Sequence, residues 1–376
     1  MKISRLHIDI TGDCNLSCIY CYLSQRGPFG KKLTTEEIIS IIGGAADYGI
    51  SRFSISGGEP LHNPDFFTIL EETKKKGKIT LFTNLYTADK KTLEKIISHG
   101  EIQEIITSLD GFSGHDIARP PSKANKIIEK LTLLREMMPI LKLTVNTVIH
   151  KFNLDELIDL FKLLNRIGVS LWRLDLPLRS SRKDIFCSLE QAVLKSAEIV
   201  KLRYAKIEYQ KSEISIFKVY KSQLEKIGIN DVASLTEVNA HPCQYFLGTI
   251  SIKENGRISL CPSFNLTMGS IGLNSNFAET AQKISEHQFF SMNLASIAPC
   301  KNCRYFQLCG TGCRSDALDW TKNYENADPI SCSIMPLTEK YVLPILSKNL
   351  RVLYQQLIDE KGSSPKYNFQ SQSEIC

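Results

Sequence analysis

The sequence lacks any uncharged apolar run that approaches the roughly 20 residues of a membrane-spanning helix. Its N-terminus lacks the apolar stretch of a secretion signal, because Asp9 falls where that stretch would lie. A strong excess of positive charge is also missing. The 46 Lys and Arg against 40 Asp and Glu give a net charge of +6, too little to indicate nucleic-acid binding. We therefore expect a cytoplasmic protein with neither a membrane nor a nucleic acid as partner.

Extremes of hydrophobicity and polarity are absent too. Hydrophobic residues make up 43% of the chain and charged residues 23%, close to the average of globular domains. This composition excludes wholesale disorder, collagen and a long coiled coil. At roughly 150 residues per domain, the 376 residues predict two domains, or one large barrel with an appendage.

Cysteine, by contrast, is abundant, with twelve residues. Cytosolic proteins keep their thiols reduced, so this number indicates metal or catalytic chemistry rather than disulfides. Ten of the twelve fall into two groups along the chain. The first group is Cys14, Cys18 and Cys21, and the second is Cys243, Cys261, Cys300, Cys303, Cys309, Cys313 and Cys332. Cys187 and Cys376 lie outside both groups, and the sequence assigns them no role.

The first 200 residues alternate short apolar runs with longer amphipathic ones. Strands are predicted at 6–10, 52–56, 79–82, 105–109, 143–148 and 170–174, and helices at 35–48, 65–76, 89–98, 123–138 and 154–167. Thr34 and Asn153 are predicted N-caps, and Gly49, Gly77 and Gly168 predicted left-handed helix ends. Six strand–helix units require a parallel sheet in an α/β fold. Either a partial (β/α)6 TIM-like barrel or a doubly wound sheet fits, and both bind ligands beyond the carboxyl ends of the strands.

The alternation ends near residue 205 and predicts the remaining organisation. We predict a first domain at 1–204, a polar and mostly helical bridge at 205–240, and a cysteine-rich domain at 241–335. That domain has short strands at 249–253 and 258–260 but little apolar core, so we expect it to fold around metal. Residues 336–360 are predicted as one helix, followed by a disordered tail, so that 336–376 forms the C-terminal helix and flexible end.

The first cysteine group directly follows the first predicted strand, with the spacing Cys14-x3-Cys18-x2-Cys21. This spacing also fits one stripe of a helix, but the neighbouring Gly12 and Asp13 favour a loop. Three thiolates at the carboxyl end of a barrel strand indicate a metal site. A zinc ion would need a fourth ligand, whereas a four-iron cluster held by three cysteines keeps one iron open for catalysis.

Cys14-x3-Cys18-x-Tyr20-Cys21 resembles the signature of the radical S-adenosylmethionine (SAM) superfamily. Further motifs similar to those of this family follow in order along the chain. They are Ser56-Gly57-Gly58-Glu59-Pro60 after the second strand, Thr83-Asn84 at the end of the third, Ser108-Leu109-Asp110-Gly111 with His115-Asp116-x-x-Arg119 after the fourth, and Asn146 at the end of the fifth. The resemblance extends over nearly the whole chain.

The resemblance implies a specific chemistry and a specific SAM site. The amine and carboxylate of SAM would chelate the open iron, and one electron would cleave SAM to a 5′-deoxyadenosyl radical that abstracts hydrogen from the substrate. The implied SAM contacts are the backbone around Gly57, Gly58 and Glu59 for the amine, Ser108 and Arg119 for the ribose and carboxylate region, Tyr20 near the adenine, and Thr83, Asn84 and Asn146 at the strand ends. A glycine pair also suits close approach of backbone to a ligand.

The second cysteine group contains Cys300-x2-Cys303-x5-Cys309-x3-Cys313. A zinc ribbon is the alternative, but it usually presents two CxxC pairs and this group has one. The whole set resembles the SPASM domain, which houses two auxiliary [4Fe–4S] clusters after many radical SAM barrels. That resemblance assigns Cys300, Cys303, Cys309 and Cys332 to the second auxiliary cluster and Cys243, Cys261 and Cys313 to the first. No cysteine lies at 236–242, so the first cluster either has an open iron or is capped by Glu237, His241, Cys187 or the substrate.

The resemblance implies a peptide-modifying radical SAM oxidoreductase with SAM and three [4Fe–4S] clusters. The expected function is maturation of a ribosomally made precursor peptide by an intramolecular crosslink, either carbon–carbon, as in a cyclophane, or thioether. The alternatives are a sulfatase-type formylglycine maturase, a dehydrogenase of a small substrate, and a non-catalytic zinc or iron–sulfur module that binds a partner. We expect an electron donor such as flavodoxin or ferredoxin. Because Cys14 comes too early for a preceding leader-binding domain, the bridge, the cysteine-rich domain or a separate protein would bind the leader.

Overall fold

The computed structural model describes residues 3–21, 23, 32–98, 100–177, 183–226, 241–243, 248–264, 266–273 and 275–358. It is a mixed α/β structure with a mostly parallel sheet, consistent with the predicted partial barrel. The chain divides into two compact units. The first comprises Met1–Leu109, Ala118–Val145 and Gln244–Phe290, and the second comprises Asp110–Ile117, Asn146–Cys243 and Ser291–Cys376.

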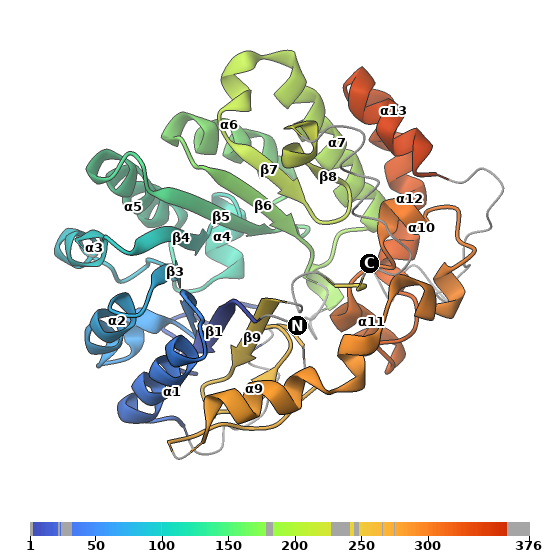
Figure 1. Ribbon diagram of the computed structural model, residues 1–376. Coiled ribbons are helices and arrows are strands. Elements are labelled where there is room, and N and C mark those ends of the chain that lie inside the picture. Colours follow the sequence, from blue (N-terminus) through green and yellow to red (C-terminus); the bar gives the residue numbers. More distant parts are fainter. Residues whose placement is uncertain are drawn as a thin grey trace. The chain divides into compact units, whose positions relative to one another are not determined.

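The first unit is built on parallel strands that lie side by side in chain order. They are β1 (Arg5–Asp9), β2 (Arg52–Ser56), β3 (Lys78–Phe82) and β4 (Ile102–Ser108). Helices α1 (Thr35–Asp47), α2 (Phe66–Lys74), α3 (Lys90–Ile97) and α5 (Ala124–Met137) cover the outer side of these strands (Figure 1). The strands and helices lie where the periodicity predicts them, with ends displaced by at most three residues.

Two strands from the predicted cysteine-rich domain join this same sheet. The strand β9 (Thr249–Ile252) pairs in parallel with β1, and β10 (Ile258–Ser259) pairs antiparallel with β9 (Figure 1). The helix α9 (Phe277–Ser285) belongs to the same unit. The two short strands therefore extend the barrel sheet instead of building a core of their own. The two compact units have other boundaries than the segments predicted to end at 204, 240 and 335. The division into those segments stays a prediction.

The second unit contains the strands β6 (Leu171–Asp175), β7 (Glu213–Ile216) and β8 (Tyr220–Lys221). The strand β7 is parallel to β6 and forms a hairpin with β8. The strand β5 (Lys142–Val148) is shared between the two units, and the short helix α4 (Ser113–Ala118) begins in the second. The prediction of a mostly helical bridge is therefore wrong for residues 205–226, and residues 227–240 lie outside the described residues. In β7 only two apolar residues alternate with polar ones, a pattern too short to be recognised.

Helices complete the second unit. They are α6 (Leu157–Ile167), α7 (Leu189–Ala205), α10 (Phe306–Cys309), α11 (Arg314–Thr321), α12 (Pro329–Tyr341) and α13 (Lys348–Gln356). The prediction of one helix over 336–360 is wrong, because a 3-10 turn at Leu343–Ile345 separates α12 from α13. Pro344 lies in this turn, where it has no N–H to continue the α-helix. The predicted tail from residue 359 onward lies outside the described residues.

The predicted helix caps are partly confirmed. Thr34 accepts a hydrogen bond from the N–H of Glu37, whose carboxylate accepts one from the N–H of Thr34, which completes a capping box. Gly49 and Gly168 have φ values of 102° and 84°, as expected of left-handed glycines. Gly77 does not; a Cβ there would lie 2.3 Å from the carbonyl oxygen of Ser51, so close packing explains this glycine.

Asn153 is not a side-chain cap, contrary to the prediction. Its amide group donates to the carbonyl oxygens of Asp110 and Val148, at 2.5 Å and 2.9 Å, so it fastens two loops together. Within the described part of the chain, no helix combines the length and the apolar character that crossing a membrane requires.

The capping box of α1 gives a direct test of the local structure. We expect Thr34→Ala to lower the free energy of unfolding by about 1 kcal/mol, because the N–H of Glu37 loses its acceptor. Thr34→Ser keeps the oxygen and should remain close to the wild type. Urea denaturation followed by circular dichroism measures both, and equal stabilities for the alanine and serine variants would contradict the cap.

Candidate functional site

The first cysteine group lies on a loop at the carboxyl end of β1, as predicted, with Cys14 exposed and Cys18 and Cys21 half-buried. The loop is held to a second segment of the same unit by two backbone hydrogen bonds. The N–H of Ser17 donates to Pro120 at 2.7 Å, and the N–H of Ile19 donates to Ala118 at 2.9 Å. The thiols are therefore presented on a loop of fixed backbone, next to Arg119.

The glycine pair packs against this loop, backbone against backbone. The N–H groups of Gly58 and Glu59 donate to the carbonyl oxygens of Thr11 and Asp13, at 2.8 Å and 2.9 Å. A Cβ on Gly57 would lie 2.4 Å from the oxygen of Thr11, and a Cβ on Gly58 would lie 2.3 Å from the oxygen of Asp13. The close approach that makes glycine necessary is thus made to the cysteine loop. These two N–H groups already donate to the cysteine loop. A ligand amine is itself a donor, and it would donate to the carbonyl oxygens of the motif.

Glu59 organises the ends of two strands. Its carboxylate, 1% exposed, accepts from the Thr83 hydroxyl at 2.7 Å, from the Asn84 N–H at 2.6 Å and from the Leu61 N–H at 3.1 Å. Burial raises the pKa of Glu59, although these donors act in the opposite direction. Asn84 in turn donates from its side chain to Asn15 at 2.8 Å, beside Cys14. The carboxylate therefore fixes the position of Thr83 and Asn84 relative to the cysteine loop.

Arg119 lies beside the first cysteine group. Its guanidinium is 3.9 Å from the sulfur of Cys18 and 5.2 Å from the ring centre of Tyr20. Both side chains are about nine-tenths buried. A planar guanidinium in this position suits a carboxylate ligand. The predicted SAM residues Tyr20, Arg119, Gly57 and Glu59 therefore belong to one unit with the three cysteines.

The remaining predicted SAM residues, Ser108 and Asn146, lie in different compact units. Ser108 is the last residue of β4 in the first unit. Asn146 lies on β5 in the second unit, and its side-chain oxygen has no hydrogen-bond partner among the described residues. The structure therefore leaves the assignment of Asn146 to the SAM site a prediction.

The acidic residue of the fourth-strand motif has a structural task. Asp110 is fully buried and accepts from the N–H of Val148 at 2.9 Å, while its own N–H donates to His115 Nδ1 at 3.3 Å. The following turn is closed by Glu156, whose carboxylate accepts from the N–H of Phe112 at 2.6 Å. These contacts shape the chain that leads to Arg119.

The sequence analysis missed a buried polar cluster at β1. His7 and Asp9 lie on the face of β1 opposite the fully buried Leu6, and are 2% and 3% exposed. His7 Nε2 is 3.4 Å from Asp9 Oδ1, and the ammonium of Lys253 is 3.7 Å from Asp9 Oδ2. Neither ring nitrogen of His7 has a hydrogen-bond partner in the described residues. The sequence did contain a signal for this cluster. Polar and apolar residues alternate in this strand, although a strand buried on both faces is expected to be apolar throughout.

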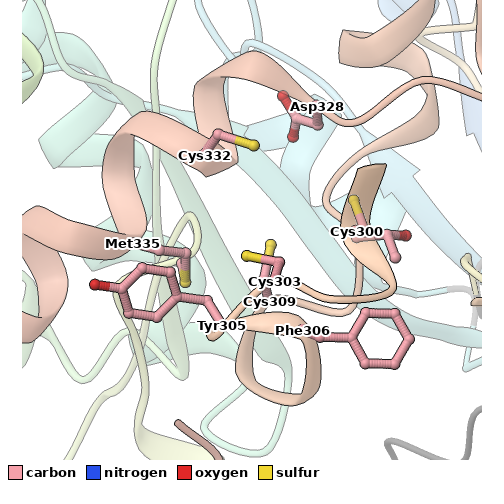
Figure 2. A pocket seen from close by; sticks show the side chains of 9 residues that line it. Cys300, Cys303, Tyr305, Phe306, Cys309, Asp328, Cys332 and Met335 are labelled. Carbon is pink, nitrogen blue, oxygen red and sulfur yellow. The ribbon is translucent and has the colours of Figure 1, made fainter. Parts of the chain in front are cut away.

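Four cysteines of the second group line one pocket. Figure 2 shows the side chains of Cys300, Cys303, Cys309 and Cys332 around it, together with Tyr305, Phe306, Asp328 and Met335. Cys300 ends a 3-10 turn, Cys309 ends α10, and Cys332 lies on the first turns of α12. Sequence-distant segments of the second unit thus bring four thiols to one place.

The pocket disfavours free thiolates. Burial, together with the neighbouring Cys309 and Cys303, raises the pKa of Cys300 to about 12. Burial likewise raises the pKa of Cys309 and of Cys332. Burial lowers the pKa of Lys218, but the opposite charges of Cys309, Asp328 and Cys313 outweigh it, so the pKa of this ammonium is raised. A bound cationic centre would stabilise four thiolates here.

The donor set fits an iron–sulfur cluster. No three His, Cys, Asp or Glu side chains of the described chain converge closely enough to hold a single metal ion. A [4Fe–4S] cluster does not require that convergence, because each of its cysteines binds a different iron. Four thiols around one buried pocket are the ligands that such a cluster needs.

The residues predicted for the first auxiliary cluster are not brought together by either unit alone. Cys243 and Cys313 belong to the second unit and Cys261 to the first. His241 Nδ1 lies 3.0 Å from the N–H and 3.0 Å from the carbonyl oxygen of Cys243. Cys187 is buried. Glu237 and Cys376 lie outside the described residues.

Residues 8–164 match the model of the Radical SAM superfamily. The chain is 22% identical over 344 residues to the AdoMet-dependent heme synthase of Nitratidesulfovibrio vulgaris, covering 87% of this chain and 91% of that protein. It is 25% identical over 326 residues to a GTP 3′,8-cyclase of Clostridium botulinum, covering 77% and 97%. Residues 8–164 of this chain therefore form a radical SAM domain. That class implies SAM and a [4Fe–4S] cluster as cofactors.

Solved structures share its fold over most of the chain. Native anSMEcpe with bound AdoMet has a TM-score of 0.70 at 16% identity, covering 94% of this chain and 99% of that chain. Streptococcus suis SuiB bound to precursor peptide SuiA has a TM-score of 0.63 at 16% identity, covering 88% and 76%. The likeness extends well beyond the radical SAM domain, and at this identity it establishes the fold alone.

The packing of the glycine pair predicts a sensitive position. We expect Gly58→Ala to displace the cysteine loop, because the new methyl group would meet the backbone of Asp13. The variant should bind SAM at least tenfold more weakly and retain less iron. Gly43→Ala on α1 is the matched control, since a Cβ there meets nothing within 4 Å. Equilibrium dialysis with labelled SAM measures the affinity, and unchanged binding and iron content in Gly58→Ala would contradict the packing argument.

Proposed function

We propose that this radical SAM enzyme matures a ribosomally made precursor peptide by installing an intramolecular crosslink. The observation that carries this proposal is the pocket of four cysteines in the part of the chain beyond the radical SAM domain. A second redox site suits an oxidation that must dispose of an electron. The fold shared with SuiB, solved with its precursor peptide, supports a peptide as substrate.

The first site holds the radical-forming cofactors in this proposal. Cys14, Cys18 and Cys21 bind a [4Fe–4S] cluster, Arg119 binds the SAM carboxylate, and the carbonyl groups around Gly57 accept from its amine. When bound, the pair supplies a 5′-deoxyadenosyl radical, which abstracts one hydrogen atom from the substrate. The contacts of Glu59 with Thr83 and Asn84 keep the loops around the cofactor in place.

Crosslink formation constrains what else the protein must supply. A bond formed with loss of two hydrogens releases one as an atom to the radical and the other as a proton, together with one electron. Asp9, buried between His7 and Lys253 at the end of β1, is a suitable proton acceptor. We assign the cysteines of the second group to two auxiliary clusters of a SPASM domain, which gives three clusters in all. Cys300, Cys303, Cys309 and Cys332 hold one, and Cys243, Cys261 and Cys313 hold the other.

The partners follow from the same assignment. A low-potential donor such as flavodoxin or ferredoxin would reduce the first cluster. The bridge at 205–240, the cysteine-rich segment or a separate protein would recognise the leader of the precursor peptide. We assign the protein to the cytoplasm, where reduced thiols and such donors are present.

Oxidation of a small substrate is the second candidate function. The observation that favours it is the similarity to a heme synthase and a GTP cyclase over most of the chain. Formylglycine formation in a sulfatase is an alternative within peptide maturation. The two experiments below separate these candidates.

The first experiment tests the radical site. The triple variant Cys14→Ala, Cys18→Ala, Cys21→Ala should lose SAM cleavage and about one four-iron cluster, since no thiolate is left to hold it. Cys376→Ala, which changes a cysteine outside both groups with no ligand role in this proposal, is the matched control and should keep both. Anaerobic assays of 5′-deoxyadenosine and iron give the measurement; 5′-deoxyadenosine from the triple variant would show that the radical site is elsewhere.

The second experiment tests the substrate class. A short peptide encoded beside this gene, coexpressed with the enzyme, should lose two hydrogens for each crosslink and resist fragmentation between the linked residues in mass spectrometry. Coexpression with the triple cysteine variant is the control and should leave the peptide mass unchanged. Reaction of the product with a hydrazide would instead indicate formylglycine. An unmodified peptide in the presence of an enzyme that cleaves SAM would favour the small-substrate function.

A further inference from the structure

The loop between Cys309 and Cys313 has an unusual backbone. Gly310, Thr311 and Gly312 all adopt positive φ values, of 60°, 65° and 82°. Glycine adopts this region without strain, but a β-branched residue such as threonine rarely does. A threonine in the middle of this run is therefore strained, and strained residues cluster at functional sites.

The surrounding structure holds Thr311 in this conformation. A Cβ on Gly312 would lie 2.4 Å from the Cβ of Asp328, so the loop is packed tightly against the start of α12. The fully buried guanidinium of Arg314 donates to the carbonyl oxygen of Thr311, and also to those of Tyr324 and Asn326 at 2.7 Å each. The backbone of Thr311 is thus fixed from both sides, and its side chain has a defined place.

That place is the pocket of the four cysteines. Thr311 lines it together with Cys300, Cys303, Cys309 and Cys332, and is only 2% exposed. Its hydroxyl group has no hydrogen-bond partner among the described residues. A buried hydroxyl without an acceptor is unfavourable, so the position is explained if an acceptor enters the pocket.

We propose that the hydroxyl of Thr311 donates a hydrogen bond to a sulfur of the cluster in this pocket and thereby raises its reduction potential. The inference rests on the proposed assignment of Cys300, Cys303, Cys309 and Cys332 as cluster ligands. Uptake of one electron makes the cluster more negative, so a hydrogen bond to sulfur stabilises the reduced form more than the oxidised one. The electron is the one that crosslink formation releases from the substrate, and the hydroxyl keeps its proton throughout.

A nearby positive charge acts in the same direction. The ammonium of Lys218 interacts with Cys309 and Cys313, which flank Thr311. A cation beside the thiolates also favours the more negative, reduced cluster. Thr311 and Lys218 together would hold this cluster ready to accept an electron, the role that an oxidative crosslink requires of a second redox site.

The test uses reconstituted full-length protein with Cys14, Cys18, Cys21, Cys243 and Cys261 changed to Ala, so that neither the radical-forming cluster nor the other auxiliary cluster contributes a signal. Thr311→Val removes the donor and keeps the branched shape, Thr311→Ser keeps the donor, and Thr311→Gly removes both the donor and the strain. Potentiometric titration followed by electron paramagnetic resonance should give a lower potential for the valine and glycine variants. The serine variant should match the parent. A valine variant with the parent's potential, or a serine variant that follows valine, would overturn the proposal.

A second measurement detects the hydrogen bond directly instead of through the reduction potential. After exchange into deuterated water, electron–nuclear double resonance of the reduced cluster in the parent protein should detect a strongly coupled deuteron, which persists in Thr311→Ser and is lost in Thr311→Gly. Absence of that deuteron from the parent would contradict the hydrogen bond. A parent that carries no iron at all in this background would instead refute the cluster assignment itself, which separates the two failures.

Discussion

Close contact between two loops is the constraint on which the first site depends. The glycine pair after β2 packs directly on the backbone of the cysteine loop, with two hydrogen bonds across the contact. No side chain fits between them, so the thiols of Cys14, Cys18 and Cys21 are presented by a backbone that rests on Gly57 and Gly58. Glu59 extends the same arrangement to β3 through Thr83 and Asn84. One short motif therefore connects the cluster loop to two strand ends.

The two cysteine sites differ in environment, and the difference suits different tasks. The loop after β1 leaves Cys14 exposed and the other two thiols half-buried, as expected where a cofactor and a substrate must reach an open iron. In the second site Cys300 is buried, Cys303, Cys309 and Cys332 are half-buried, and the ammonium of Lys218 interacts with Cys309. A charged group beside the ligands tunes a redox centre. We infer that radical formation and electron uptake are assigned to separate thiol sets.

A buried cluster of polar side chains at β1 is a third feature of the protein, in addition to the two cysteine sites. His7 and Asp9 occupy one face of the strand, while Leu6 and Ile8 on the other are fully buried. The parallel pairing of β1 with β9 brings Lys253 to Asp9, although the two residues are far apart in sequence. This places a buried carboxylate between a lysine and a histidine, on the strand that leads into the cysteine loop.

The sequence by itself determined the strands and helices of the barrel, the Thr34 cap and the positions of both cysteine groups, because periodicity, capping and ligand spacing are local properties of a chain. It did not predict that β9 and β10 extend the barrel sheet, that β7 follows α7, or that a turn at Pro344 divides the C-terminal helix. It also missed the meeting of Asp9 with Lys253 and the buried hydroxyl of Thr311. These features were decided by tertiary structure, because pairing between distant segments and the burial of an individual polar group depend on which surfaces meet, and no local pattern records that.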